Sequence, residues 1–228
     1  MKITSLLCRA LCIFAVPLTG LADLYQPVQN YIDTSLNQFD QIDHERRKEL
    51  RRIALYVRTQ TGIGNEASLN FICTHNSRRS HMSQLWAQTA ADYYGIKGVK
   101  TFSGGTEATA FNPRAVAAMK RAGFNIEKTL EGKNPLYHVR NGEDGEPMRA
   151  FSKKYEHEEN PQDKFCAVMV CSDADKNCPT VNGASYRVAI PYVDPKAFDN
   201  TELEAAKYDE RCRQISREML FLFSQVEA

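Results

Sequence analysis

The stretch FICTHNSRRSHM (71–82) contains the residue types that could carry chemistry. Two β-favouring residues lead into Cys73, polar residues and two arginines follow, and the pattern becomes helical from Ser80. A loop between a strand and a helix turns its backbone N–H groups into a small concavity, where the helix dipole adds positive charge. Arg79 can bind an oxyanion there through its planar guanidinium. Because the same field favours the thiolate of Cys73, the stretch predicts a thiol nucleophile that faces a bound tetrahedral oxyanion.

The other residues of this oxyanion-binding loop are expected to support the thiolate or to form the pocket wall. Ser80 can donate a hydrogen bond to the sulfur, and Asn76 can hold the unusual loop backbone. No individual role is assigned to the remaining loop residues, which are Thr74, His75, Ser77 and Arg78. For an isolated C-x5-R, a buried structural cysteine beside surface arginines would be the preferred interpretation. The strand before the loop and the helix after it favour the nucleophile.

The stretch VMVCSDADKNCP (168–179) contains two further candidates, Cys171 and Cys178. Zinc sites usually need closer cysteine pairs, and no second pair or nearby histidine completes a site here, so no metal is expected. A redox pair is more natural, in which one thiolate attacks a sulfur adduct and the second thiolate resolves it. Spacing alone fits two incidental cysteines equally well.

Asp194, in YVDPK, is the last candidate. A carboxyl group on a loop next to proline is held rigidly, so it could protonate a leaving oxygen. An ordinary turn aspartate is the commoner case for a lone Asp-Pro pair.

The elements around these residues predict how they are positioned. Strands alternate with helices, which predicts an α/β fold: a small parallel four-stranded sheet with helices on both faces and the site at the carboxyl ends of the strands. Two helices within 24–62 form an expected N-terminal extension. The polar stretch 130–164 is rich in turn residues, with a hairpin tip at 141–147. Strands are expected at 67–73, 99–105, 164–171 and in 186–195, and the other helices after 80, at 112–123 and at 201–226.

Composition excludes several classes of protein. The chain has 228 residues, 43% of them hydrophobic, and a formal net charge of +1, so it can bury a core and has no overall field for nucleic acid or a membrane surface. The run RRKELRR (46–52) spreads its charges over several faces of an expected helix, which is typical of a solvated surface.

The N-terminus and the cysteines point to different compartments. Residues 1–22 have the outline of a secretory signal peptide, although Arg9 and Pro17 interrupt it, and their apolar part is too short for a membrane span. The later cysteines are odd in number and suggest no disulfide-stapled scaffold, which favours a reducing compartment. Export and a cytoplasmic location therefore both stay open.

Together these motifs make the sequence resemble the low-molecular-weight protein tyrosine phosphatases and, within that fold, the thioredoxin-coupled arsenate reductases. The resemblance rests on FICTHNSRRS, on FSGGTEATAFNPRAVAAMKRAGFNI (102–126), on the cysteine pair and on the Asp-Pro of YVDP. It covers roughly 67–129 and 165–226. It implies a main domain at 67–228 with an insertion at about 130–164, preceded by a helical extension at 23–66.

The resemblance also implies a reaction. Cys73 would attack the arsenic of arsenate while Arg79 and the loop amides hold its oxygens, and Asp194 would act as general acid. Cys171 would attack the Cys73–arsenic adduct and release arsenite. Cys178 would then take over the disulfide, which thioredoxin would reduce. The implied protein is a monomer without a bound cofactor, with thioredoxin as electron donor.

Two other functions stay open. A phosphatase acting on phosphotyrosine or a small phosphoester would need only Cys73, Arg79 and Asp194, because phosphate and arsenate share charge and shape. A non-catalytic oxyanion or redox sensor would need no acid. His75 and Arg78 depart from the family's usual residues, and the insertion could alter substrate access. The pair Cys171 and Cys178 is the feature that favours the reductase.

Overall fold

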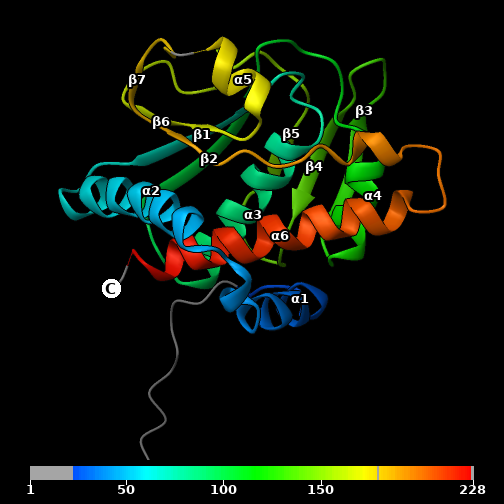
Figure 1. Cartoon of the computed structure of the whole chain (residues 1–228), viewed down its shortest axis with the longest axis horizontal. Coiled ribbons are helices and arrows are strands. Elements are labelled where there is room, and N and C mark those ends of the chain that lie inside the picture. The colour runs from blue at the N-terminus through cyan, green and yellow to red at the C-terminus, as the bar shows by residue number, and fades with distance from the viewer. Residues whose placement is uncertain (1–22, 179, 227–228) are drawn as a thin grey trace, which may run out of the picture.

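The computed structural model describes residues 23–178 and 180–226, and its centre is a parallel sheet (Figure 1). The signal-like residues 1–22 lie outside the described residues. The strand order β2-β1-β6-β7 confirms the predicted four-stranded parallel sheet. Every residue of the central β1 is buried, as is typical of a strand covered on both faces. The strands are β1 (Ala67–Cys73), β2 (Val99–Gly105), β6 (Phe165–Met169) and β7 (Ala184–Ala189).

Helices lie on both faces of this sheet, as predicted. Helices α2 (His44–Gly62), α3 (Arg79–Tyr93) and α6 (Glu204–Ser224) lie on one side of the strands and α5 (Ser172–Asn177) on the other (Figure 1). Trp86 of α3 is fully buried where α3 and α6 pack together. The core of the domain is therefore continuous from the sheet to α6.

The predicted N-terminal helices are present and pack on α6. Helix α1 (Gln26–Leu36) and the 3-10 turn η1 (Phe39–Gln41) precede α2. The Ser35 and Ser216 hydroxyls are 2.9 Å apart in the buried contact between α1 and α6. Helix α2 begins after Asp43, whose carboxylate accepts the N–H of Arg46 at 2.8 Å, a standard N-cap.

A second, antiparallel sheet was not predicted from the sequence. Its order is β3-β4-β5, formed by β3 (Asn125–Leu130), β4 (Leu136–Arg140) and β5 (Met148–Ala150). Only Ile126 of β3 is buried, so the strand has almost no apolar pattern to detect. The expected hairpin tip at 141–147 does connect β4 to β5. Helix α4 (Pro113–Arg121) starts at its predicted cap, Asn112.

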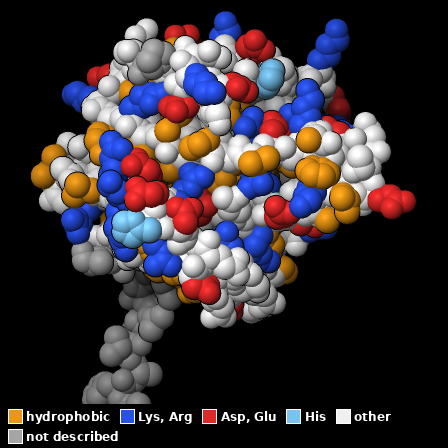
Figure 2. Space-filling view, viewed as in Figure 1, with side chains coloured by type: hydrophobic (Ala, Val, Ile, Leu, Met, Phe, Trp, Pro, Cys, Tyr) orange, Lys and Arg blue, Asp and Glu red, His pale blue; other side chains and the backbone are white. Residues whose placement is uncertain are grey.

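The surface is mixed in charge. Basic and acidic side chains are interspersed over the face seen in Figure 2, in keeping with the net charge of +1. Within residues 23–178 and 180–226, no helix is both long and apolar enough to cross a membrane.

Candidate active site

The parallel register brings the first two candidate cysteines to one edge of the sheet. Strands β1 and β6 are neighbours, with Ile72 opposite Met169. Cys73 ends β1, and Cys171 follows β6 by two residues, so both thiols lie at the carboxyl ends of adjacent strands. Cys171 Sγ lies 3.5 Å from Oγ1 of Thr74, the residue after Cys73.

The loop 74–78 between β1 and α3 is tied down through its carbonyl groups. The segments 106–112 and 152 supply the donors, and no backbone N–H of residues 74–78 donates to another residue of the described chain. The N–H groups of residues 74–78 are therefore unpaired within the described chain. We call this loop the cradle, and binding of an anion there stays a prediction. The hydrogen bonds are Thr106 Oγ1 to Thr74 O (3.1 Å), Glu107 N to Thr74 O (2.8 Å), Ser152 Oγ to His75 O (3.0 Å) and Asn112 N to Ser77 O (2.8 Å).

Gly105, at the end of β2, lets the loop pack this closely. A Cβ at this position would lie 2.7 Å from both Thr74 O and Asn76 N and 2.2 Å from Glu107 O, all of them backbone atoms. Gly105→Ala should therefore displace the loop, lowering the free energy of unfolding by about 1–3 kcal/mol and turnover roughly 100-fold. Urea unfolding and p-nitrophenyl phosphate hydrolysis would measure the two effects.

Gly62→Ala is the matched control, because nothing lies within 4 Å of the added Cβ at the end of α2. It should leave both quantities nearly unchanged. Normal turnover by the Gly105 variant would contradict the close packing of β2 against the loop.

Cys73 is linked to two polar side chains behind the loop. Its Sγ lies 3.1 Å from Ser80 Oγ, and Asn76 Nδ2 donates to the same Oγ at 2.9 Å. Since the amide uses a lone pair of the hydroxyl, the hydroxyl proton is free to point at the sulfur. The Ser80 hydroxyl can therefore donate a hydrogen bond to Cys73 Sγ. Asn76 has a φ of 43°, in the left-handed region that asparagine tolerates well.

Arg79 and Asp194 form an ion pair. Nη2 of Arg79 lies 2.8 Å from Asp194 Oδ2, and its Nη1 donates to the Tyr192 carbonyl at 2.9 Å. The Nε of Arg79 is buried and has no acceptor among the described residues. Asp194 also accepts the N–H of Lys196 at 3.0 Å, so its carboxyl group has a fixed direction. The arrangement therefore joins the guanidinium at the start of α3 to the carboxyl group of the segment that follows β7.

Cys171 and Cys178 cap opposite ends of α5. Cys171 is fully buried, and its Sγ accepts the N–H of Ala174 at 3.3 Å. Cys178 is half-buried after the last turn. A helix rises about 1.5 Å per residue, so seven residues separate the two Cα atoms by roughly 10 Å. A disulfide needs less than about 7 Å, so this pair can bond only if α5 unwinds.

His75 and Arg78 are held by other contacts, and Arg78 also lies beside the carboxylate that Arg79 binds, with its Nε 3.9 Å from Asp194 Oδ1. The ring of His75 is 46% exposed and lies 3.6 Å from Glu107. Arg78 Nε donates to the Tyr208 hydroxyl at 2.9 Å, and its Nη2 lies 3.6 Å from Asp199. Burial raises the pKa of Tyr208 to about 12, so its hydroxyl stays protonated at neutral pH. Arg78 thus ties the loop to α6 and to the turn after Asp194.

Two residues behind the site had no sequence signal. The N–H of Lys153 donates to Asn76 Oδ1 at 2.8 Å, and its carbonyl accepts the N–H of Gly105 at 2.9 Å. His81 is fully buried next to Ser103, and burial holds the pKa of its ring well below the usual value, so it is neutral. Both contacts are made in three dimensions by segments far apart in the sequence.

Comparison with known proteins identifies the family. A family model described as low molecular weight phosphotyrosine protein phosphatase matches residues 68–133. Arsenate reductase 2 of Staphylococcus epidermidis is 33% identical over 144 residues, which cover 63% of this chain and 89% of that protein. An arsenate reductase of Staphylococcus aureus is 31% identical over 115 residues, covering 50% of this chain and 67% of that one.

Among solved structures, a low-molecular-weight phosphotyrosine phosphatase from Vibrio cholerae is 12% identical, with a TM-score of 0.47, and covers 71% of this chain and 97% of its own. Family membership rests on the sequence relatives, since the Staphylococcus epidermidis protein is matched over most of its length. The named members of the family are reductases and phosphatases, so the chain is an enzyme of one of these kinds. It belongs to the low-molecular-weight protein tyrosine phosphatase superfamily, on the branch that includes the arsenate reductases.

Proposed function

We propose that this protein is an arsenate reductase in which Cys73, Cys171 and Cys178 act in turn. The observation that carries the proposal is the position of Cys171, buried against Thr74 at the edge of the cradle. A phosphatase needs no second thiol there. The arsenate reductases among the sequence relatives support the same activity.

The first step would form a bond between Cys73 and arsenic. The oxyanion would replace Asp194 as the partner of the Arg79 guanidinium. It would also accept hydrogen bonds from the unpaired N–H groups of loop 74–78. The Cys73 thiolate attacks arsenic(V), and a hydroxyl leaves as water after Asp194 gives it a proton. Ser80 holds the thiolate before the attack.

The second step would reduce arsenic. The Cys171 thiolate attacks the sulfur of Cys73, the sulfur–arsenic bond breaks, and its electron pair leaves with arsenic as arsenite. The two thiols together lose two electrons and become the Cys73–Cys171 disulfide. Cys178 then attacks Cys171 and frees Cys73. Because this last exchange requires α5 to unwind, the Cys171–Cys178 disulfide would be exposed to an external dithiol, for which we propose thioredoxin.

A phosphatase is the second candidate, favoured by the part of the site that involves no second cysteine. Formation of a phosphoenzyme and its hydrolysis need only four side chains, those of Cys73, Ser80, Arg79 and Asp194. The reductase proposal therefore depends on the relay and is tested through it.

The test compares Cys171→Ser with the wild type on two substrates. Arsenite release would be followed with thioredoxin, thioredoxin reductase and NADPH, and hydrolysis with p-nitrophenyl phosphate. We expect arsenate turnover to fall roughly 1,000-fold or more, to background, while hydrolysis changes less than about threefold. The reason is that only the second step needs Cys171.

Cys166→Ala is the matched control, because this thiol is buried in β6 and burial raises its pKa, which makes it inert. It should reduce arsenate normally. Wild-type protein that hydrolyses the phosphoester but releases no arsenite would refute the reductase and leave the phosphatase.

A further inference from the structure

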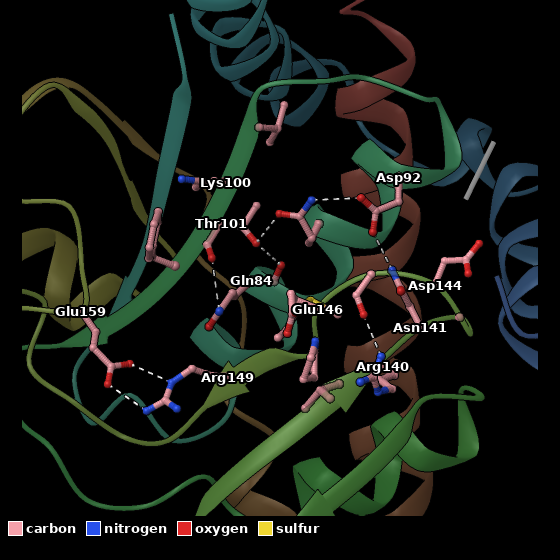
Figure 3. Close-up of a pocket in the computed structure, with 18 of the residues that line it drawn as sticks. Gln84, Asp92, Lys100, Thr101, Arg140, Asn141, Asp144, Glu146, Arg149 and Glu159 are labelled. Carbon is pink, nitrogen blue, oxygen red and sulfur yellow. Dashed lines mark hydrogen bonds and ion pairs between the residues drawn. The ribbon is translucent and has the colours of Figure 1, made fainter. Parts of the chain in front are cut away.

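A cavity of about 760 Å³ lies between the two sheets, away from the nucleophile loop (Figure 3). Its walls come from α3, from the edge strand β2, from the β4–β5 hairpin and from the segment that follows β5. None of its lining residues belongs to loop 73–80. The cavity lies outside the loop, and the two are joined through the backbone of Lys153, which holds Asn76 and Gly105. The inference drawn from the cavity does not depend on the reaction proposed above.

Lys153 brings a buried amine to this cavity. The residue is only 5% exposed, and in the described part of the chain its Nζ makes no hydrogen bond or ion pair. Nζ lies over the face of the Phe151 ring, 4.6 Å from its centroid. A buried ammonium group without a counter-ion is costly, and a bound anion would remove that cost.

Gln84 brings an unused acceptor. The side chain is 5% exposed and is fixed by its Nε2, which donates to the Thr101 carbonyl at 3.2 Å. Its Oε1 is buried and has no donor among the described residues. Because buried amide oxygens are nearly always hydrogen-bonded, a ligand N–H would satisfy this group.

The rim of the cavity carries three carboxylates without ion pairs among the described residues, beside the basic side chains of Lys100 and Arg140. Asp144 and Glu146 lie on the hairpin turn beside the cavity (Figure 3), and Asp23 lines it from the N-terminal segment. All three are exposed, and none forms an ion pair within residues 23–178 and 180–226. A fourth carboxylate of the cavity, that of Glu159, is paired: its Oε1 lies 3.0 Å from Arg149 Nη2. The cavity therefore combines a cation and an acceptor inside with unpaired carboxylates outside.

We propose that this cavity binds a small zwitterion of the amino-acid class. The ligand carboxylate pairs with Lys153 Nζ, an amino group donates to Gln84 Oε1, and a second cationic group reaches the carboxylates of Asp144 and Glu146. A ligand with only a carboxylate would leave the carboxylates of Asp144 and Glu146 without a cation. A ligand with only an amine would leave Lys153 Nζ without an anion.

The pairing gives binding a defined pH dependence. Burial lowers the pKa of Lys153 to about 8, with Glu159 raising it and Arg149 lowering it. A carboxylate binds the protonated amine, so affinity is fully present well below pH 8 and falls as the pH rises through about 8. The charged or titratable groups on the surrounding elements are Asp23, His81 and Asp92 of α3, Lys100 of β2, Arg140 of β4, Asp144, Glu146, Arg149 of β5 and Glu159.

Calorimetric titration of the full chain with three probes tests the proposal. L-lysine carries the carboxylate and both amines, hexanoate carries only the carboxylate, and cadaverine carries only the amines. We expect saturable binding of L-lysine below about 10 mM, at least roughly tenfold weaker binding of the other two, and loss of L-lysine affinity above pH 8.

Two variants locate the ligand. Lys153→Met keeps the length of the buried chain and should weaken L-lysine binding at least roughly tenfold, and Glu146→Gln should weaken L-lysine but not hexanoate. Lys154→Met, on the exposed neighbouring residue outside the cavity, is the control and should bind normally. Absence of L-lysine binding, equal binding by Lys153→Met, or equal binding of hexanoate and L-lysine would each overturn the proposal.

Discussion

Cys73→Ser is expected to lower both arsenate reduction and p-nitrophenyl phosphate hydrolysis by roughly 10⁴-fold or more. Both proposed reactions begin with the same sulfur attacking a tetrahedral centre, and a serine hydroxyl is not ionised at neutral pH. The Ser80 hydroxyl, 3.1 Å from this sulfur, can stabilise a thiolate but cannot deprotonate a serine. Initial rates on both substrates with the same protein sample would measure the loss.

The informative comparison is Cys178→Ser. That variant should hydrolyse the phosphoester at the wild-type rate and reduce arsenate for only one turnover, because the disulfide could not leave Cys73. Substantial hydrolysis by Cys73→Ser would show that another residue is the nucleophile. Equal loss of both activities in Cys178→Ser would remove the relay from the mechanism.

Arg79→Lys is expected to lower turnover on either substrate roughly 100- to 1,000-fold. Lysine keeps the positive charge but lacks the planar fork that binds two oxygens of an oxyanion. In the structure the Arg79 guanidinium is oriented by hydrogen bonds to Tyr192 O and Asp194. Its Nε has no acceptor among the described residues. Kinetics at several phosphoester concentrations would separate weaker binding from slower chemistry.

Arg121→Lys is the control for this substitution. Arg121 also forms a forked pair, with the carboxylate of Asp209 at 2.6 Å, but on the surface, where both side chains are 44% exposed. Its replacement should change turnover less than about twofold, because exposed ion pairs contribute little. Similar losses in the two variants would mean that Arg79 stabilises the fold and does not bind the oxyanion.

The parallel sheet could be predicted because its two central strands, β1 and β6, are buried throughout and mostly apolar. The first residues of α2 and α4 could also be predicted from the sequence. Asp43 and Asn112 are N-caps, and a cap acts on the neighbouring backbone without any tertiary contact. Cys73 and Arg79 were placed by the same local logic, as the end of a strand and the start of a helix. Their roles, and those of Asp194, Cys171 and Cys178, stay predictions until the kinetics are measured.

The rest of the site depends on contacts between distant segments. Nothing in NSRRS tells which of two adjacent arginines makes the short contact with Asp194. Arg79 makes it at 2.8 Å, whereas Arg78 lies 3.9 Å away and donates to Tyr208 of α6. The antiparallel sheet was missed because β3 is mostly exposed, so its strands have no strong apolar alternation. The cavity between the sheets was therefore also outside the reach of sequence patterns.

The hydrogen bond that Asn76 Oδ1 accepts from a backbone N–H far along the chain has a consequence for synthesis of the protein. The donor, the N–H of Lys153, lies 77 positions downstream, and Ser152 binds the carbonyl of His75 across the same separation. Closing so long a segment costs entropy that local contacts cannot repay. On the ribosome, β1 and α3 would emerge with their loop still unsupported. The oxyanion cradle becomes complete only after the residues beyond β5 have left the exit tunnel.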